Sequence, residues 1–168
     1  MITLISGCTA GDPADPGDTP AAGVGTSATV VKVIDGDTVR VRIGDETELV
    51  RLLGIDTPEV ENPHRPAGCY GQEASAYTRA ALPVGSRVTL TSDASQGSRD
   101  RFDRLLAYVD TTPGRDVMTS VNARLLLEGY ARIYVIRRNP FAHAEAFREA
   151  ERVARDAGRG LWSACPRE

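Results

Sequence analysis

Four short segments of this 168-residue chain place carboxylates beside predicted turns, and two of the four also contain arginines. A guanidinium group presents a planar fork of donors that matches phosphate or carboxylate, which a lysine ammonium cannot imitate. Of the 20 basic residues only Lys32 is a lysine, a bias that GC-rich coding would also produce. The bias does not explain the placement of individual arginines. The four segments are residues 33–38, 51–59, 70–74 and 99–108, and the arginines lie in the second and the last of them.

Each segment taken alone also has a structural explanation. Asp35 and Asp37 flank Gly36, and Asp-Gly is among the commonest hairpin signals. Asp56 and Glu59 could each be a solvated residue at the end of a strand, residues 99–108 a charged turn, and residues 70–74 an ordinary helix start. A solvated strand end explains less well an apolar run, 51–59, that has opposite charges at its two ends.

Hydrophobic periodicity predicts the elements that position these residues. The β-branched and alternating segments predict strands, and Asp-Gly and Gly-Asp turns connect the first three into an antiparallel meander. This order favours an α+β fold, a five-stranded barrel of the oligonucleotide/oligosaccharide-binding (OB) type with three helices. The predicted strands are 28–33, 38–43, 48–55, 87–91 and 105–110, the helices 70–82, 117–128 and 141–157, and a short extended segment 130–136.

Five motifs, in this order, resemble those of the staphylococcal-nuclease-like thermonucleases. They are Ile-Asp-Gly-Asp-Thr (34–38), Arg-Leu-Leu-Gly-Ile-Asp-Thr-Pro-Glu (51–59), Tyr-Gly-Gln-Glu-Ala-Ser (70–75), Asp-Arg-Phe-Asp-Arg-Leu-Leu-Ala-Tyr (100–108) and Gly-Leu-Trp (160–162). The resemblance covers residues 28–165. It implies a five-stranded OB barrel with three helices and a Ca²⁺-dependent phosphodiesterase that acts on DNA and RNA.

The resemblance also implies the site residues. Asp37 and Asp56 match the calcium carboxylates, and Thr57 matches the position that supplies a backbone carbonyl. Glu59 matches the glutamate near the attacking water, as general base or as an orienting group. Arg51 and Arg104 match the arginines that grip the scissile phosphate.

This residue set suits the reaction, because the site must neutralise the phosphate and stabilise the charge of a five-coordinate transition state. Two departures from the family pattern occur at Phe102-Asp103, where a Tyr-Gly pair is usual. Loss of the phenol removes a hydrogen bond to nucleotide, and Asp103 is expected to add negative charge near Arg104. Tyr134 is the candidate for a tyrosine packed against a base.

The charge is unevenly divided along the chain. Residues 1–27 hold three aspartates and no Lys or Arg, which accounts for the whole net charge of −3 and leaves residues 28–168 neutral. Gly, Pro, Asp, Ala and Thr dominate the first part, which predicts a flexible spacer before one domain, 28–168. Small residues before Cys8 resemble a lipoprotein signal; the alternative is an unmodified cysteine. No stretch approaches the ~20 apolar residues of a membrane-spanning helix.

Cys69 and Cys165 remain once Cys8 is set aside. An even number of cysteines in an exported protein predicts a disulfide, and two isolated buried thiols are the alternative. The expected protein is therefore a monomeric, calcium-dependent endonuclease, secreted or anchored to the cell envelope through a lipid on Cys8. A non-catalytic nucleic-acid-binding module of the same fold is the main alternative, and a structural envelope lipoprotein is a third. A binder would not need the acid and arginine set together.

Overall fold

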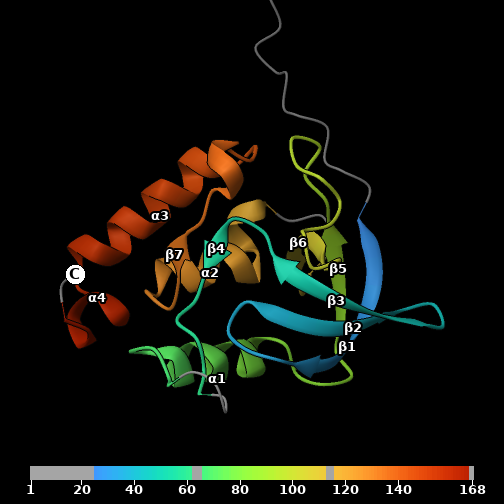
Figure 1. Cartoon of the computed structure of the whole chain (residues 1–168), viewed down its shortest axis with the longest axis horizontal. Coiled ribbons are helices and arrows are strands. Elements are labelled where there is room, and N and C mark those ends of the chain that lie inside the picture. The colour runs from blue at the N-terminus through green and yellow to red at the C-terminus, as the bar shows by residue number, and fades with distance from the viewer. Residues whose placement is uncertain (1–24, 62–65, 113–115, 167–168) are drawn as a thin grey trace, which may run out of the picture.

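Five strands close into a barrel in the computed structural model, which describes residues 25–61, 66–112 and 116–166. The strand order is β1-β2-β3-β6-β5, with β3 and β6 parallel and the other neighbours antiparallel. This confirms the predicted α+β fold with a five-stranded OB-type barrel. The strands are β1 (Thr26–Val33), β2 (Thr38–Ile43), β3 (Glu46–Leu52), β5 (Arg87–Thr91) and β6 (Leu105–Asp110). Figure 1 shows the barrel on one side of the molecule and most of the helices on the other.

Alternation along β2 separates the inside of the barrel from its outer face. Val39 and Val41 are fully buried, whereas Arg40 and Arg42 are exposed. Successive side chains of a strand point to opposite faces, so the outer residues of β2 are Thr38, Arg40 and Arg42. In the register with β3, Thr38 lies opposite Arg51. The outer face of the barrel therefore carries one of the predicted phosphate arginines.

The predicted strand 48–55 is wrong as a single element. β3 ends at Leu52, and Gly54 turns the chain with a positive φ of 81°. A Cβ atom at Gly54 would lie 2.5 Å from the ring of Phe141, so both conformation and space require glycine here. After this turn β4 (Ile55–Asp56) leaves the barrel and pairs with β7 (Arg132–Ile133) in a separate two-stranded sheet.

Three substantial helices confirm the expected number, with adjusted bounds. They are α1 (Gly71–Ala81), α2 (Val121–Leu127) and α3 (Ala144–Asp156), and a short α4 (Leu161–Ala164) follows. The predicted helix 117–128 is split, because the Ser120 hydroxyl accepts a hydrogen bond from the Ala123 amide and caps α2. The residues before this cap form a 3-10 turn, η1 (Val117–Thr119). The predicted extended segment 130–136 holds only β7, and a second 3-10 turn, η2 (Ile136–Arg138), follows it.

Helix α3 is amphipathic and carries ion pairs along its exposed face. Arg148 pairs with Glu145, and Arg152 pairs with Glu149, both at a spacing of three residues. Arg152 also pairs with Asp156, at a spacing of four residues. Phe147 is fully buried on the opposite face of the helix. The charged face of α3 is therefore occupied by its own internal pairs.

Asn122 holds the helical side of the molecule against the barrel. Its side chain is fully buried, donates to the carbonyl oxygens of Leu53 and Ala107, and accepts from the amide of Val109. These bonds join α2 to β6 and to the turn after β3. The turn that carries the chain into Asp56 is thereby fixed from the inside.

The described residues include no helix long and apolar enough to cross a membrane. Residues 1–24, which contain Cys8 and most of the predicted spacer, lie outside the described residues, so the prediction of a lipid on Cys8 is untested.

Candidate active site

A cleft of about 910 Å³ lies on the outer face of the barrel beside β3 and β6. The structure brings five of the six predicted site residues to it, although they come from three segments that are separate in the sequence. Thr57, the sixth, does not line the cleft but donates hydrogen bonds to Asp37, which does. The five lining residues are Asp37, Arg51, Asp56, Glu59 and Arg104.

Asp37 sits at the entrance to β2 and is held by Thr57. One oxygen, Oδ2, accepts from the Thr57 amide at 2.9 Å and from the Thr57 hydroxyl at 3.2 Å. The other oxygen, Oδ1, accepts from the Thr38 hydroxyl at 3.0 Å. A Cβ atom at Gly36 would lie 2.6 Å from the Thr57 hydroxyl oxygen, so glycine in this turn allows Thr57 to approach. The Asp-Gly-Asp turn thus makes a hairpin and also fixes one carboxylate in the cleft.

Arg51 lies between the two predicted calcium carboxylates. Its Nη2 atom is 2.7 Å from Oδ1 of Asp56 and 3.1 Å from Oδ2 of Asp37. Its Nη1 atom donates to the carbonyl oxygens of Leu52 at 3.1 Å and Ile55 at 2.7 Å. Because the side chain is buried and four oxygens surround its terminal nitrogens, the guanidinium group is positioned before any substrate binds.

Arg104 is fixed by Asp100 and not by the neighbouring Asp103. Its Nε donates to Oδ2 of Asp100 at 2.7 Å, and its Nη1 donates to the Thr38 hydroxyl at 3.3 Å. Burial alone would raise the pKa of Asp100, but the hydrogen bonds from Arg104 and two backbone amides outweigh burial and lower it. The Asp103 carboxylate is exposed and lies 3.6 Å from Arg99. The carboxylate that contacts Arg104 is thus Asp100, while Asp103 contacts Arg99; the expected effect of the Asp103 charge on Arg104 stays a prediction.

Glu59 lines the cleft from the segment between β4 and α1, and its backbone contacts two glycines. Its carbonyl oxygen accepts from the Gly68 amide at 2.9 Å. A Cβ atom at Gly71 would lie 2.2 Å from the same oxygen. The first residue of α1 must therefore be glycine for the helix to pack this closely against the Glu59 carbonyl. The position of Glu59 thus depends on residues 68–71.

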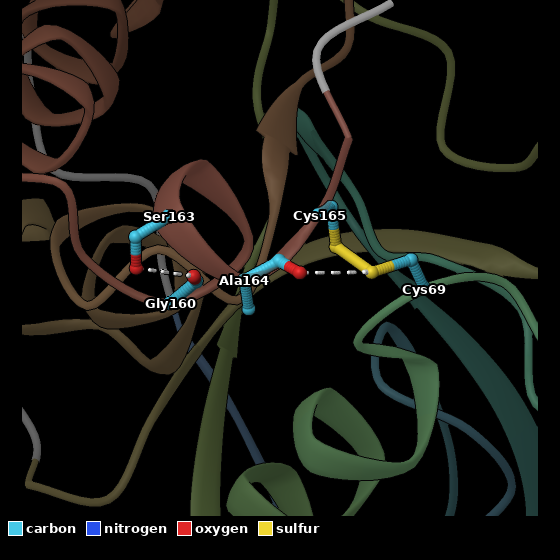
Figure 2. The surroundings of a disulfide bond; sticks show 5 residues. All are labelled: Cys69, Gly160, Ser163, Ala164 and Cys165. Carbon is cyan, nitrogen blue, oxygen red and sulfur yellow. Dashed lines mark hydrogen bonds between the residues drawn. A yellow bond between two sulfur atoms is a disulfide. The ribbon is translucent and has the colours of Figure 1, made fainter.

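A disulfide anchors those same residues. Cys69 and Cys165 are bonded, with their Cα atoms 5.8 Å apart, which confirms the predicted pairing and excludes two isolated thiols. Figure 2 shows the bond joining the chain just before α1 to the end of α4, near the Ala164 carbonyl. Cys69 is exposed, so the bond is open to solvent. It ties the segment that carries Glu59 to the C-terminal end of the described chain.

Asp35 is a cleft residue that the sequence flagged only as part of a hairpin turn. It lines the cleft and accepts a hydrogen bond from the Asp37 amide at 3.1 Å. Burial, and then the nearby Asp37 charge, raise the pKa of Asp35 to about 6. Burial also raises the pKa of Asp56, with Asp37 and Glu59 adding to the rise and Arg51 opposing it. Burial is the largest cause of both shifts, so they show that these carboxyls are partly withdrawn from water, with neighbouring carboxylates adding to the effect.

The cleft offers oxygen ligands for a divalent cation, and two of them are the carboxylates of Asp37 and Asp56. In the described part of the chain, no three His, Cys, Asp or Glu side chains come together as a metal cluster. Asp37 and Asp56 nevertheless reach the same nitrogen of Arg51, so their oxygens are close to each other. Calcium accepts such a set when carbonyl oxygens and water complete its six to eight ligands. The donors fit the calcium expectation in chemical type and in charge.

Two exposed aromatic side chains also border the cleft. Phe102 is 63% exposed, with the Arg101 guanidinium 4.6 Å from its ring centre. Tyr134, the residue suggested for a base contact, is 48% exposed and lines the same cleft. An exposed aromatic ring beside a phosphate-binding cleft is suited to stacking on a nucleobase.

Comparison with known proteins agrees with this geometry. A family model described as staphylococcal nuclease homologue matches residues 49–164. A thermonuclease of Staphylococcus hyicus is 35% identical over 134 residues, covering 80% of this chain and 74% of the relative. Endonuclease YncB of Bacillus subtilis is 33% identical over 137 residues, covering 82% and 62%. A thermonuclease of Staphylococcus intermedius is 40% identical over 108 residues, covering 64% and 60%. The chain belongs to the family of staphylococcal nuclease homologues.

Proposed function

We propose that this chain is a calcium-dependent endonuclease that hydrolyses phosphodiester bonds in DNA and RNA. The observation that carries the proposal is the convergence of Asp37, Arg51, Asp56, Glu59 and Arg104 on one cleft. That the chain is a nuclease, a hydrolase, follows from its family and from its similarity to thermonucleases and endonucleases. The calcium requirement, the substrates and the residue roles are the proposal.

The two arginines bind the scissile phosphate and stabilise the charge that develops on it. Arg51 is buried and held by two backbone carbonyls, so it loses little freedom when an anion arrives. Arg104 reaches the cleft from the start of β6, where Asp100 fixes its Nε edge. Guanidinium groups held in this way donate charge-assisted hydrogen bonds that strengthen as the phosphorus becomes five-coordinate. Removing such a donor typically costs about 10²–10³ in kcat.

Glu59 orients the attacking water and accepts its proton. The water oxygen bonds to phosphorus, the bond from phosphorus to the leaving oxygen breaks, and the leaving oxygen takes up a proton. Glu59 is exposed and lines the cleft together with Asp56. General-base catalysis of this kind contributes about 10²–10⁴ in rate.

Asp37 and Asp56 would hold the calcium ion, with Thr57 supplying a carbonyl oxygen. A bound divalent cation adds a Lewis acid at the phosphate and neutralises excess negative charge. The chain's own contribution is the fixed carboxylate of Asp37, which the Thr57 amide and hydroxyl hold in place. The grouping of Asp35, Asp37 and Asp56 along one wall of the cleft supports a cation there.

The disulfide supports export from the cytoplasm. Disulfides persist in oxidising compartments, and the Cys69 and Cys165 pair is a structural one in this fold. We therefore propose an extracellular or envelope-anchored monomer, with a lipid on Cys8 as the anchor. Mass spectrometry of the membrane fraction tests the anchor, since an intact upstream segment and a free Cys8 thiol would refute it.

The decisive test incubates the purified protein with single-stranded DNA and with RNA, in calcium or in chelator, between pH 7 and 10. We expect internal cleavage of both polymers with calcium and none with chelator. Glu59→Gln should lose activity by about 10²–10⁴ while its circular dichroism spectrum and its affinity for DNA stay unchanged. Cleavage that continues in chelator refutes the calcium requirement, and a fully active Glu59→Gln protein removes Glu59 from the reaction. Binding without any cleavage would establish the non-catalytic module instead.

A further inference from the structure

Four exposed cations form a strip on the outer face of the barrel, next to the cleft. In the described part of the chain none of them has an ion pair or a side-chain hydrogen bond. Other arginines in the described part of the chain have acidic partners, as on α3, where Arg148 and Arg152 contact Glu145 and Glu149. The strip, which has no function in the cleavage scheme above, consists of Lys32, Arg40, Arg42 and Arg87.

The strand register places these four side chains together. Lys32 lies opposite Arg40 across the β1 and β2 ladder. One row further from the cleft, Thr29 lies between Arg42 on β2 and Arg87 on β5. Neighbouring strands are about 4.8 Å apart and alternate residues along a strand about 6.7 Å apart. The strip is thus two rows deep and three strands wide, with Val39 and Val41 buried directly beneath it.

The strip is continuous with the phosphate arginines. Thr38, the outer residue of β2 before Arg40, accepts a hydrogen bond from Arg104 and lies opposite Arg51. The outer face of β2 therefore runs from the cleft to Arg40 and then to Arg42, about 13 Å in all. Beyond Arg42 the hairpin turn carries two exposed carboxylates, Asp45 and Glu46. Their negative charge would repel a phosphate, so the strip ends at Arg42.

We propose that this strip binds the phosphates of a nucleic-acid strand beyond the cleavage position, so that the protein prefers long polymers over short oligonucleotides. This inference rests on the proposed function, because it assumes that a nucleic-acid substrate occupies the cleft. It places the part of the substrate that leaves the cleft on the outer faces of β2 and β1. The 6.7 Å repeat of outer residues along β2 is comparable with the spacing of successive phosphates in an extended strand. Arg40 and Arg42 are spaced at that repeat along β2, and Lys32 and Arg87 lie beside them. Together the four cations could contact about two to three phosphates.

Continuity with the cleft favours nucleic acid over an anionic lipid surface as the occupant. A strand held by Arg51 and Arg104 passes directly onto Arg40 without crossing an acidic residue of β2. Contacts of this kind carry no base information, so the preference should be for length and not for sequence. They also release counterions, with a slope of about 0.7 per phosphate in single strands, so binding should weaken as salt rises.

The test compares Arg40→Gln/Arg42→Gln with Arg148→Gln/Arg152→Gln, a control that removes the same charge from the paired face of α3. KM and kcat are measured with calcium on a 4-nucleotide and a 30-nucleotide single-stranded DNA. For the strip variant we expect KM on the long strand to rise about tenfold, with kcat and the short-strand KM unchanged. Its salt slope should fall by about 1.4, the value for two phosphates. The α3 variant should match the wild type.

A second measurement keeps the inference separate from catalysis. Fluorescence anisotropy of the labelled 30-mer in chelator, with the full chain, reports binding alone, and we expect about a tenfold weaker affinity for the strip variant only. Equal affinities for wild type and strip variant, or an equal rise in KM for both lengths, would overturn the proposal. Loss of binding to phosphatidylglycerol vesicles without loss of DNA binding would assign the strip to a lipid surface instead. Failure of the wild type to cleave either length would refute the proposed function, not the strip.

Discussion

Removing the disulfide should weaken both the fold and the position of Glu59. The bond closes a loop with a sequence separation of 96, and the variant we consider is Cys69→Ser/Cys165→Ser. In the chain-entropy model a loop of this length restricts the unfolded state by about 4.7 kcal/mol. Domains of this size have about 5–15 kcal/mol of stability, so the variant should remain folded at 25 °C with much of its margin lost.

The loss of activity follows from the local geometry and is a separate effect. Cys69 lies between Gly68, whose amide donates to the Glu59 carbonyl, and α1, whose first residue packs on the same oxygen. When the bond is absent, that segment loses its tie to α4 and Glu59 samples more positions. We expect kcat to fall about tenfold with little change in KM, because displacement of a catalytic group affects the reaction more than the binding of substrate.

Urea unfolding monitored by Trp162 fluorescence, with and without reductant, measures the first effect, and cleavage kinetics at 25 °C measure the second. Reductant should move the wild-type midpoint down to that of the variant and leave the variant unchanged. Equal midpoints for oxidised wild type and variant would refute the entropic argument. An unchanged kcat in a destabilised variant would show that the disulfide stabilises the fold without positioning Glu59.

Three further substitutions test individual contacts. Burial raises the pKa of Asp110 to about 6, so its charged form costs stability at neutral pH, and Asp110→Asn should gain about 1 kcal/mol at pH 7.5 by urea unfolding. That gain should shrink as pH falls through 6 and vanish below the unfolded pKa of 3.8, where the carboxyl binds a proton in both states. Phe102→Tyr restores a phenol beside the cleft and should lower KM a few-fold at constant kcat. Asn122→Ala leaves buried backbone groups of Leu53, Ala107 and Val109 without their partner and should cost about 2–4 kcal/mol, with normal activity well below its melting temperature.

The barrel was predictable because its signal is local. Val39 and Val41 alternate with Arg40 and Arg42, and this pattern alone gives the strand, its inner face and its outer face. The break at Gly54 was not predictable in the same way. Leu-Leu-Gly-Ile forms a continuous apolar run, and the turn depends on the ring of Phe141 from a distant part of the chain.

The site residues were identified by resemblance, and local sequence alone would have left them undecided. Asp37 lies in the turn before β2 and Arg51 lies on β3, and their 3.1 Å contact exists only after β2 and β3 pair in register. The sequence did not identify Asp100 as a site residue, because an aspartate is also expected in any charged turn. Its hydrogen bond from Arg104 is seen only in the folded structure. Asp35 had a visible signal, its place in the Asp-Gly-Asp turn, but that signal is also the signal of any hairpin.

The same logic explains how a domain with no net charge can act on a polyanion. Residues 28–168 balance in sum, yet the balance is not local: three aspartates share one wall of the cleft with Arg51, while Arg40 and Arg42 on the adjoining surface have no acidic partner. The acidic wall would repel a phosphate by itself, which is why a cation is proposed there. The unpaired strip would attract one at any calcium concentration. Substrate capture and cleavage are therefore expected to depend on different ions, the first on monovalent salt and the second on calcium.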